Sequence, residues 1–566
     1  MKFVRKLPLI SARCFAAGAV IAGAALSASA ITIGGNDGGV ALHGSVQFTG
    51  LFPEDDEAIG TEHSTHPLLF NSYADLNMIS KYVDAGIRLE FMKWPLPGFD
   101  PDFKGWGVPH VYVKGRVKGF ELTGGTFYEQ FGSGFILRTY EERSLGIDNS
   151  ILGGRVKWNG VQGITITALG GLQRCYWDWK KKSQVYGADA TVEISTLAPS
   201  LSKRGISWTA GVSYVLKHED EQDVFIPGSD MRLNLPTNVS AFDVRSELRK
   251  GAWGVMAEAA WKGQDPSFDN NYTYGHGSAY MLSASYSRSG MSALIQAKRS
   301  ENMAYRSQRM ASGTAAFLNN MPAFAYLHTY SLPALYPYAT QAAPGEWAFQ
   351  GSFAYTFKRR TPLGGKYGTK VKINASYIRG LDRKLDAPLL EGSNVLYGTD
   401  WGSTSFFGMG KEFYHDFNIQ IDKKWSASVS QLFMYMNQNY NKTVVEGKGG
   451  LIHANIFVVD TKWRMNRRLT LRNELQYLHT RQDQKDWAYG LLELSIAPYL
   501  MISISDMWNC GDTGTHYYMG GVAGTYRANR LMLSYGRTRA GFDCSGGVCR
   551  YVPASRGVNL TYVYNF

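Results

Sequence analysis

The amino-acid sequence predicts an all-β protein, a large antiparallel up-and-down transmembrane β-barrel of about 24 strands, within a range of roughly 20 to 26. Three observations predict this fold. Apolar and polar residues alternate with a period of two along the whole chain. Tight turns alternate with long polar loops, and the last strand ends on an aromatic residue.

The alternation is strict in several segments. Every second residue is apolar from Val371 to Tyr377, and the same pattern runs from Leu469 to Tyr477 with Asn473 as a polar interruption. Phe242 to Leu248 alternates in the same way. A soluble β-sandwich also alternates, so this pattern predicts strands and leaves the fold class open.

The connections between the strands decide the fold class. An outer-membrane barrel has short periplasmic turns at one end and long extracellular loops at the other, whereas the connections of a sandwich are not divided by length between its two ends. The tight turns are Asn159-Gly160, Arg249-Lys250-Gly251, Asp422-Lys423-Lys424, Met465-Asn466-Arg467 and Arg527-Ala528-Asn529. The long loops span 51–67, 300–345, 381–410 and 539–556. The strands therefore run from near Val40 to Phe566, with both termini on the periplasmic side.

Composition agrees with many short strands. Aromatic residues make up 13%, with 34 Tyr, and the 62 Gly suit tight turns. Beyond the first thirty residues there is no apolar run of about 18 residues, which excludes a helical membrane span. The net charge is +12, but no basic helix or base-stacking motif accompanies it, so nucleic acid is not an expected partner.

The first thirty residues predict export. Lys2, Arg5 and Lys6 precede a small-residue apolar stretch, and Ala28-Ser29-Ala30 forms a cleavage site. We expect a signal peptide over 1–30, a short periplasmic segment over 31–39 and a single barrel domain over 40–566. The expected location is the cell outer membrane, with outer-membrane lipid, lipopolysaccharide and the barrel-assembly machinery as partners.

The C-terminal strand is the most specific single signal. Val558, Leu560, Tyr562, Tyr564 and Phe566 share one face of the predicted strand. Tyr562, Tyr564 and Phe566 resemble the assembly signal of outer-membrane barrels, which often has Gly where Thr561 stands.

Three further segments carry a family resemblance. Residues 126–134, 138–143 and 544–553 resemble a Bacteroidota outer-membrane β-barrel family of unknown function. The resemblance implies the barrel fold and the outer membrane, and it implies no catalytic residues.

Four cysteines remain after residue 30, Cys175, Cys510, Cys544 and Cys549, and all fall in predicted extracellular regions. Cys544 and Cys549 flank two glycines, so we favour a disulfide between them over four free thiols. No CxxC motif or paired His accompanies the cysteines, so we expect neither a metal nor another cofactor.

The densest charged cluster follows Gly132-Ser133-Gly134. The glycines lack the Lys-Ser/Thr tail of a phosphate loop, and we expect them to bend a strand. We expect a mouth cluster in which the charged side chains pair with one another, with an ionic girdle at a constriction as the alternative. Its members are Arg138, Glu141, Glu142 and Arg143.

Charged residues at the polar positions of the strands are expected to face the lumen, because a Lys or Arg facing lipid near the bilayer midplane costs roughly 2–4 kcal/mol. One reading is a self-neutralising network that stiffens the wall, and the other is a hydrated conduit with a mild anion preference. The candidates are Arg88, Glu90, Lys114, Arg116, Arg155, Lys157, Asp189, Glu193, Asp243, Arg245, Glu247, Lys370, Lys372, Asp416, Arg472 and Glu474.

A barrel of this size needs an obstruction, since barrels of about 22 strands are plugged. Too few residues precede the first strand for a plug domain, so we expect the chain's own loops or a partner protein to fill the lumen. The charge-poor segment 300–345 is the best internal candidate.

Two functions remain open. The first is a non-enzymatic porin-like channel or passive transporter. The second is a scaffold that docks a surface lipoprotein or a secretion or assembly component, with the lumen closed. An enzyme is not expected, because the histidines are scattered and none is paired with a nucleophile.

Overall fold

The computed structural model describes residues 31–33, 39–61, 64–177, 183–225, 232–270, 273–311, 313–326, 329–338, 345–382, 389–390, 395–397, 405–545 and 548–566. The predicted signal peptide lies outside the described residues. No helix in these ranges is long and apolar enough to cross a membrane.

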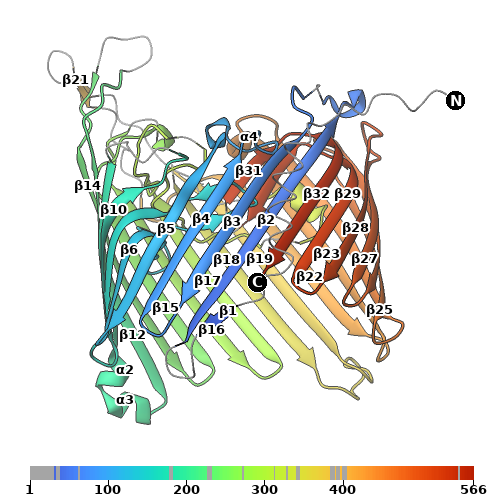
Figure 1. Cartoon of the computed structure of the whole chain (residues 1–566). Coiled ribbons are helices and arrows are strands. Elements are labelled where there is room, and N and C mark those ends of the chain that lie inside the picture. Colours follow the sequence, from blue (N-terminus) through green and yellow to red (C-terminus); the bar gives the residue numbers. More distant parts are fainter. Residues whose placement is uncertain are drawn as a thin grey trace.

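One antiparallel sheet of 25 strands dominates the molecule, and 24 of them close into a barrel (Figure 1). The remaining strand, β1 (Ile31–Ile33), pairs with the start of β2 outside the closed ring. The first twelve barrel strands are β2 (Val40–Glu54), β3 (Leu69–Ile79), β4 (Val83–Met92), β5 (Gly105–Val117), β6 (Phe120–Phe127), β9 (Ile151–Trp158), β10 (Ile164–Gln173), β11 (Ser183–Glu193), β12 (Ile206–Glu219), β14 (Asn238–Lys250), β15 (Trp253–Lys262) and β16 (Gly277–Arg288). The other twelve are β17 (Met291–Glu301), β18 (Gly345–Phe357), β19 (Thr369–Leu381), β22 (Met409–Lys424), β23 (Val429–Asn441), β24 (Leu451–Arg464), β25 (Leu469–His479), β26 (Trp487–Ile496), β27 (Leu500–Asn509), β28 (His516–Tyr526), β29 (Asn529–Thr538) and β32 (Ser555–Asn565). The predicted barrel of about 24 strands is confirmed.

The seam joins the first and last barrel strands, with a register from Ser45 opposite Asn565 to Glu54 opposite Arg556. The backbone of Phe566 continues it, since its N–H donates to the carbonyl of Gly44 at 2.9 Å and its carbonyl accepts from Gly44 at 3.0 Å. A Cβ added to Gly44 would lie 2.2 Å from the Phe566 ring. The terminal aromatic residue therefore packs directly on the seam.

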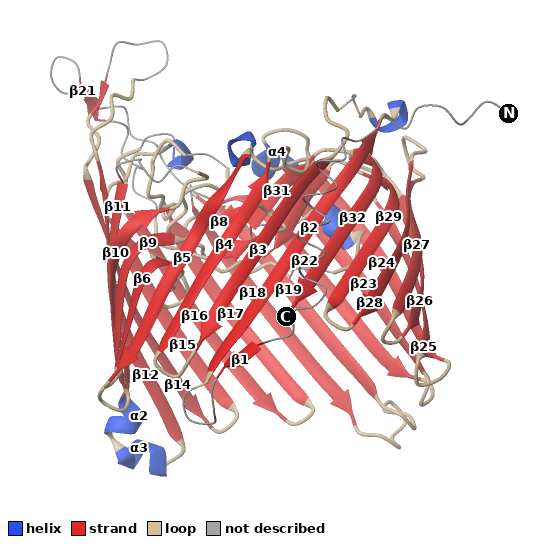
Figure 2. Ribbon diagram, in the orientation of Figure 1, coloured by secondary structure: helices blue, strands red, loops and turns tan. Residues whose placement is uncertain are grey.

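The two ends of the barrel differ, as the pattern of connections predicts (Figure 2). Most turns at the lower end are short, and the β5–β6 turn uses Lys118 (φ 46°) and Gly119 (φ 82°), both in the left-handed region that a tight hairpin requires. The largest connection there holds α2 (Ile194–Leu197) and α3 (Pro199–Lys203). The turn predicted at Asp422-Lys423-Lys424 is wrong in position, because β22 continues through Lys424 and the turn occupies 425–428.

The upper end carries the long loops, so we assign it to the extracellular side. Small elements lie in these loops, among them the hairpins β7 (Glu141–Glu142) with β8 (Ile147–Asp148) and β30 (Gly541–Ser545) with β31 (Val548–Val552). The others are β13 (Arg232–Leu233), β20 (Leu389–Leu390), β21 (Val395–Tyr397), α4 (Lys442–Glu446), η1 (Glu57–Ile59), η2 (Pro101–Phe103), η3 (Phe268–Asn270) and η4 (Pro333–Leu335).

The main apolar core lies inside the barrel. Outward positions are apolar and exposed, such as Ile504 at 63% and Leu531 at 50%, as a lipid-facing wall requires. Two chain segments fill much of the interior: the first internal segment (128–150) and the described part of the second internal segment (302–344). Phe135 and Leu318, one from each, are both fully buried.

Candidate functional site

The first internal segment leaves the wall after β6 and turns back at Gly132 and Gly134, whose φ angles are 51° and 92°. The backbone N–H of Ser133 donates to both carboxylate oxygens of Glu258 on β15, at 2.9 and 3.1 Å. A Cβ on Gly132 would lie 2.5 Å from one of those oxygens. The glycines therefore allow a turn that encloses a carboxylate, and the expectation that they bend a strand is wrong.

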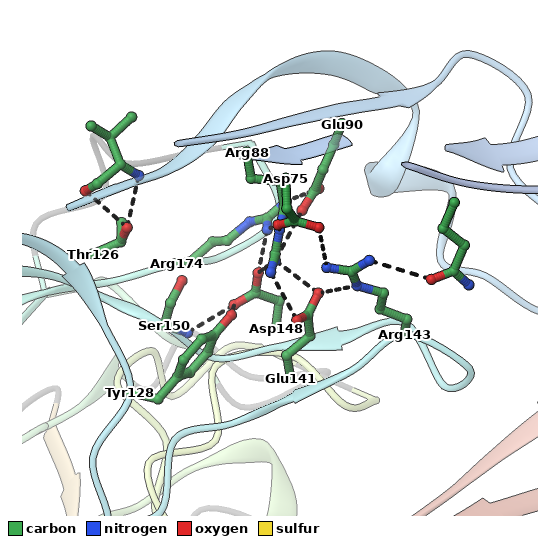
Figure 3. Close-up of polar contacts among 12 residues, drawn as sticks. Asp75, Arg88, Glu90, Thr126, Tyr128, Glu141, Arg143, Asp148, Ser150 and Arg174 are labelled. Atoms are coloured by element: carbon green, nitrogen blue, oxygen red, sulfur yellow. Dashed lines mark hydrogen bonds and ion pairs between the residues drawn. The ribbon is translucent and has the colours of Figure 1, made fainter. Parts of the chain in front are cut away.

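An ion-pair network ties this segment to β3 and β4 (Figure 3). Arg88 on β4 donates from Nε to Asp75 at 2.6 Å and binds both oxygens of Glu141 at 2.8 and 3.0 Å. Arg143 completes a ring of four, since it contacts Glu141 at 2.8 Å and Asp75 at 2.9 Å. Two-pronged pairs of this kind fix orientation as well as position.

A third arginine, Arg174 in the loop after β10, extends the network. It contacts Glu90 of β4 at 2.7 Å and Asp148 at 2.5 Å. Asp148 also accepts from the Tyr128 hydroxyl at 3.0 Å and from the Ser150 N–H at 3.1 Å. Three arginines thus face four carboxylates within the part of the network that Figure 3 draws, and this network clamps 128–150 against the wall.

The predicted mouth cluster is only partly correct. Glu141 and Arg143 pair with each other, as expected, but their other partners are the wall residues Arg88 and Asp75. Arg138 lies 5.4 Å from the ring of Tyr140, and Glu142 accepts from the Ser144 hydroxyl. The four residues therefore do not pair only with one another. Two of them pair with wall residues, and the other two contact close neighbours in the chain.

Glu90, Glu141 and Asp148 have ligand atoms within 4.8 Å of one another, a spacing that could hold a metal ion. Arg88 or Arg174 donates to each of these carboxylates. A cation would have to displace a guanidinium, so the triad fits an ion-pair network better than a metal centre.

The second internal segment is anchored by buried charges that the sequence reading did not single out. Lys298 of β17 contacts Glu346 at 2.9 Å and donates to the carbonyl of Pro322 at 2.9 Å. Arg309 contacts Glu219 of β12 at 3.0 Å. These four charged side chains are at most 3% exposed. Lys217, Lys262 and Asp265 form a third such group, with 2.7 Å between Lys217 and Asp265. Those that lie on strands occupy lumen-facing positions of the alternating pattern, near the extracellular ends of the strands. That placement could have identified them from the sequence.

The two internal segments also bind each other. Asn319 of the second segment donates to the carbonyl of Phe135 in the first at 2.9 Å, and within its own segment to the carbonyl of Met303 at 2.7 Å. The backbone N–H of Arg138 in the first segment donates to the carbonyl of Leu318 in the second at 2.7 Å. They therefore form one internal body, and not two independent loops.

Of the remaining predicted lumen residues, several do meet in groups. Lys114, Arg116 and Arg155 surround Glu121, at 3.9, 3.6 and 2.8 Å. Arg245 bridges Asp189 at 2.6 Å and Asp243 at 3.1 Å.

Another group joins β24 and β25, where Arg472 contacts Asp460 at 3.0 Å and also contacts Glu474. Asp416 is buried beside the Tyr414 hydroxyl. The structure does not bring the others into these groups: Lys157, Glu193, Glu247, Lys370 and Lys372 lie toward the periplasmic ends of their strands.

The lumen face divides into two arcs. We call the inner face of the upper half of β11–β25 the covered arc, because it packs against the internal segments, and ten of its apolar residues are at most 1% exposed. They are Val185, Val215, Val239, Ala260, Ala279, Ala348, Ile378, Met436, Ile456 and Leu478. The assumption that apolar positions face lipid fails here, because apolar side chains on both faces are shielded from water.

We call the inner face of β27, β28, β29 and β32 the open arc. Its central side chains are small or uncharged and are half-buried or exposed, with Ala523 as a buried exception. They are Met501, Ser503, Ser505, Met519, Gly521, Met532, Ser534, Asn559, Thr561 and Val563. Met532, between the lipid-facing Leu531 and Leu533, is 37% exposed toward the lumen.

The predicted disulfide is confirmed, since Cys544 and Cys549 are bonded across the β30–β31 hairpin. Val548 of this hairpin packs with Leu145 and Ile147 of the first internal segment. Cys175 is buried and Cys510 is exposed. The disulfide therefore holds an extracellular hairpin that rests on the internal body.

Comparisons with known proteins give a fold-level likeness and a family. A variant of the ferric enterobactin receptor PfeA from Pseudomonas aeruginosa matches with 8% identity and a TM-score of 0.43, over 94% of this chain and 82% of that chain. The outer-membrane protein opdK from Pseudomonas aeruginosa matches with 10% identity and a TM-score of 0.32, over 94% and 98%. OccK9 (OpdG) from Pseudomonas aeruginosa matches with 12% identity and a TM-score of 0.34, over 82% and 98%. No curated protein matches the sequence. Residues 16–566 match the Family of unknown function (DUF6029), so the chain belongs to this family.

Proposed function

We propose that this protein is a non-enzymatic passive pore of the outer membrane, in which solute passes along the open arc beside the internal body. The exposure of Met532 carries the proposal, because a lumen-facing side chain that is 37% open to water is only partly covered by other residues. The neighbouring row of Ser503, Gly521 and Ser534 is small, with a Cβ on Gly521 only 3.3 Å from the Ser503 hydroxyl and 3.4 Å from the Cβ of Ser534. Small polar side chains leave width and offer hydrogen bonds to a hydrated solute.

A mild preference for anions is part of the proposal, and it rests on the net charge of +12 and on lysines in the periplasmic half of the lumen, where Glu193 and Glu247 also lie. Lys370, Lys372 and Lys462 occupy lumen-facing positions there and are half-buried or exposed. The charges deeper in the wall are paired and contribute less field to the passage. Export through a signal peptide and contacts with outer-membrane lipid, lipopolysaccharide and the assembly machinery belong to the same proposal.

The competing proposal is a closed scaffold that docks a surface lipoprotein or a secretion component. The buried anchors of the internal body favour it, because Lys298 and Arg309 hold the segment with charge pairs that are costly to break. It predicts no conductance and a stoichiometric partner on purification.

Single-channel recording of the refolded protein separates the two. Ser534→Trp places an indole, with roughly 150–250 Å² of surface, on the open arc. We expect this variant to lose about half of its conductance or more. Leu533→Trp is the matched control, because it adds the same side chain one residue away on the lipid face. Equal currents from both variants, or no current from the unmodified protein, would rule out the pore.

A further inference from the structure

A cavity of about 760 Å³ lies among the extracellular loops, above the internal body. Both internal segments contribute to its wall, through Leu145 of the first and Arg306 and Phe317 of the second. The disulfide-bonded hairpin supplies Phe542, Arg550 and Tyr551. Its volume is in the range of small-molecule sites, roughly 300–1,000 Å³.

The walls are rich in aromatic rings. Nine of the 23 lining residues are Phe or Tyr. These are Phe99, Phe103, Phe268, Phe317, Tyr338, Phe413, Tyr440, Phe542 and Tyr551. Rings from several loops that line one partly open cavity offer stacking surfaces for a flat apolar ligand.

Most charges in the wall already have partners. Arg306 makes a two-pronged pair with Asp269, at 2.6 and 2.9 Å, and lies 3.5 Å from the Phe317 ring. Asp100 accepts a hydrogen bond from the Tyr176 hydroxyl at 2.6 Å. These groups shape the cavity and leave little charge for a ligand to neutralise.

Arg550 differs from them. Its guanidinium lies 4.2 Å from the Phe99 ring centroid, and Nε and Nη1 are buried without a hydrogen-bond acceptor among the described residues. Burial lowers the pKa of Arg550, and the carboxylate of Asp543 offsets only part of that effect. An arginine does not lose its proton in a protein, so an unpaired positive charge remains in the wall.

The position of Arg550 is fixed by its surroundings. The Cys544–Cys549 disulfide closes the hairpin next to it. Gly98 lies so close to this hairpin that an added Cβ would be 2.7 Å from the carbonyl oxygen of Tyr551. The arginine and the Phe99 loop are thus held as a preformed pair, which reduces the entropy cost of binding.

We propose that this cavity binds an organic anion with a flat aromatic body, whose carboxylate or sulfonate pairs with Arg550 while its ring stacks among Phe99, Phe542 and Tyr551. The inference does not depend on conduction, because a scaffold and a pore could both carry the site.

Calorimetric titration of the detergent-solubilised full chain tests it, with empty micelles as the blank. The probes are 1-naphthoate and 1-naphthylmethylamine, which share a ring system and differ in the sign of the charge. We expect saturable binding of the naphthoate and none of the amine. Arg550→Gln should weaken naphthoate binding roughly tenfold or more, and Arg550→Lys should restore part of it.

Arg527→Gln is the matched control, because Arg527 also lies over a ring, that of Tyr526 at 5.4 Å, but in a periplasmic turn. It should bind naphthoate like the unmodified protein. Unchanged affinity in Arg550→Gln, equal binding of the two probes, or no saturable binding by the folded unmodified protein would overturn the proposal. An unchanged circular dichroism spectrum confirms that each variant is folded.

Discussion

The covered arc and the open arc are parts of one continuous wall, yet their inner faces have opposite properties. On the covered arc, Ile456 and Ala348 are fully buried under the internal body. On the open arc, Met532 is 37% exposed at a lumen-facing position nearer the periplasmic end of its strand. The outer faces of both arcs carry exposed apolar residues, such as Val212 at 45% and Ile504 at 63%. The difference therefore arises inside the barrel, where chain segments pack over one arc and leave the other uncovered.

This contrast shows how chain segments that connect the strands can narrow a wide barrel. Inward apolar side chains on the covered arc gain from burial against Leu318 and Phe324, at roughly 25 cal/mol per Å² of apolar surface. The open arc has Met501, Met519, Met532 and Val563 interspersed with Ser, Thr, Gly and Asn, which offer less apolar surface to pack against. The apolar residues of the covered arc thus favour binding of the internal body on that side.

Removing the second internal segment should have the largest effect. Glu301 and Gly345 are direct partners across β17 and β18, so a four-residue Gly-Ser turn can replace 303–343 without moving the strands. We expect the greatest rise in single-channel conductance, because the covered arc becomes a second open wall. An unchanged conductance would show that 302–344 does not obstruct the lumen.

Loosening the body should have a smaller effect. Lys298→Met leaves Glu346 buried without its cation, which typically costs about 3–5 kcal/mol. We expect a lower thermal unfolding midpoint and noisier current. Lys462→Met, on the exposed periplasmic half of β24, should change neither. Adding Glu346→Leu to Lys298→Met should recover part of the lost stability, since it removes the carboxylate that would otherwise be buried without a cation. A double variant as unstable as the single one would contradict this reason.

Reversing charge below the body should have the smallest effect. Lys370→Glu combined with Lys372→Glu should move the reversal potential in a salt gradient toward cation preference. The change should shrink at 1 M salt, where the screening length is about 3 Å. The control is Lys358→Glu in the periplasmic turn after β18, which is exposed outside the strands. An equal change from the control would place selectivity outside the lumen.

Local sequence patterns were enough to predict the barrel. Alternation, turn spacing and the terminal Phe566 each depend on residues close in sequence, and the predicted disulfide spans five positions. The charge-poor character of 300–345 likewise singled out the second internal segment, since a long exposed loop of that composition is unfavourable.

The interior depends on pairs far apart in the chain. Arg88 and Glu141 are 53 positions apart in the sequence, and Arg309 and Glu219 are 90 positions apart. No local sequence pattern therefore indicates either pair. For this reason the sequence placed Glu141 at a mouth cluster and missed the clamp on the first internal segment. The covered arc was missed for a related reason. In the sequence, an apolar residue that faces a buried segment cannot be distinguished from one that faces lipid.

Thiol accessibility tests the two arcs most directly. In a Cys510→Ser background, which removes an exposed thiol, Met532→Cys and Ile456→Cys each place one reporter on a lumen face. During single-channel recording we expect a charged, membrane-impermeant thiol reagent to reduce the current through Met532→Cys and to leave Ile456→Cys unmodified. Modification of Ile456→Cys with loss of current, while Met532→Cys stays unreactive, would contradict the account.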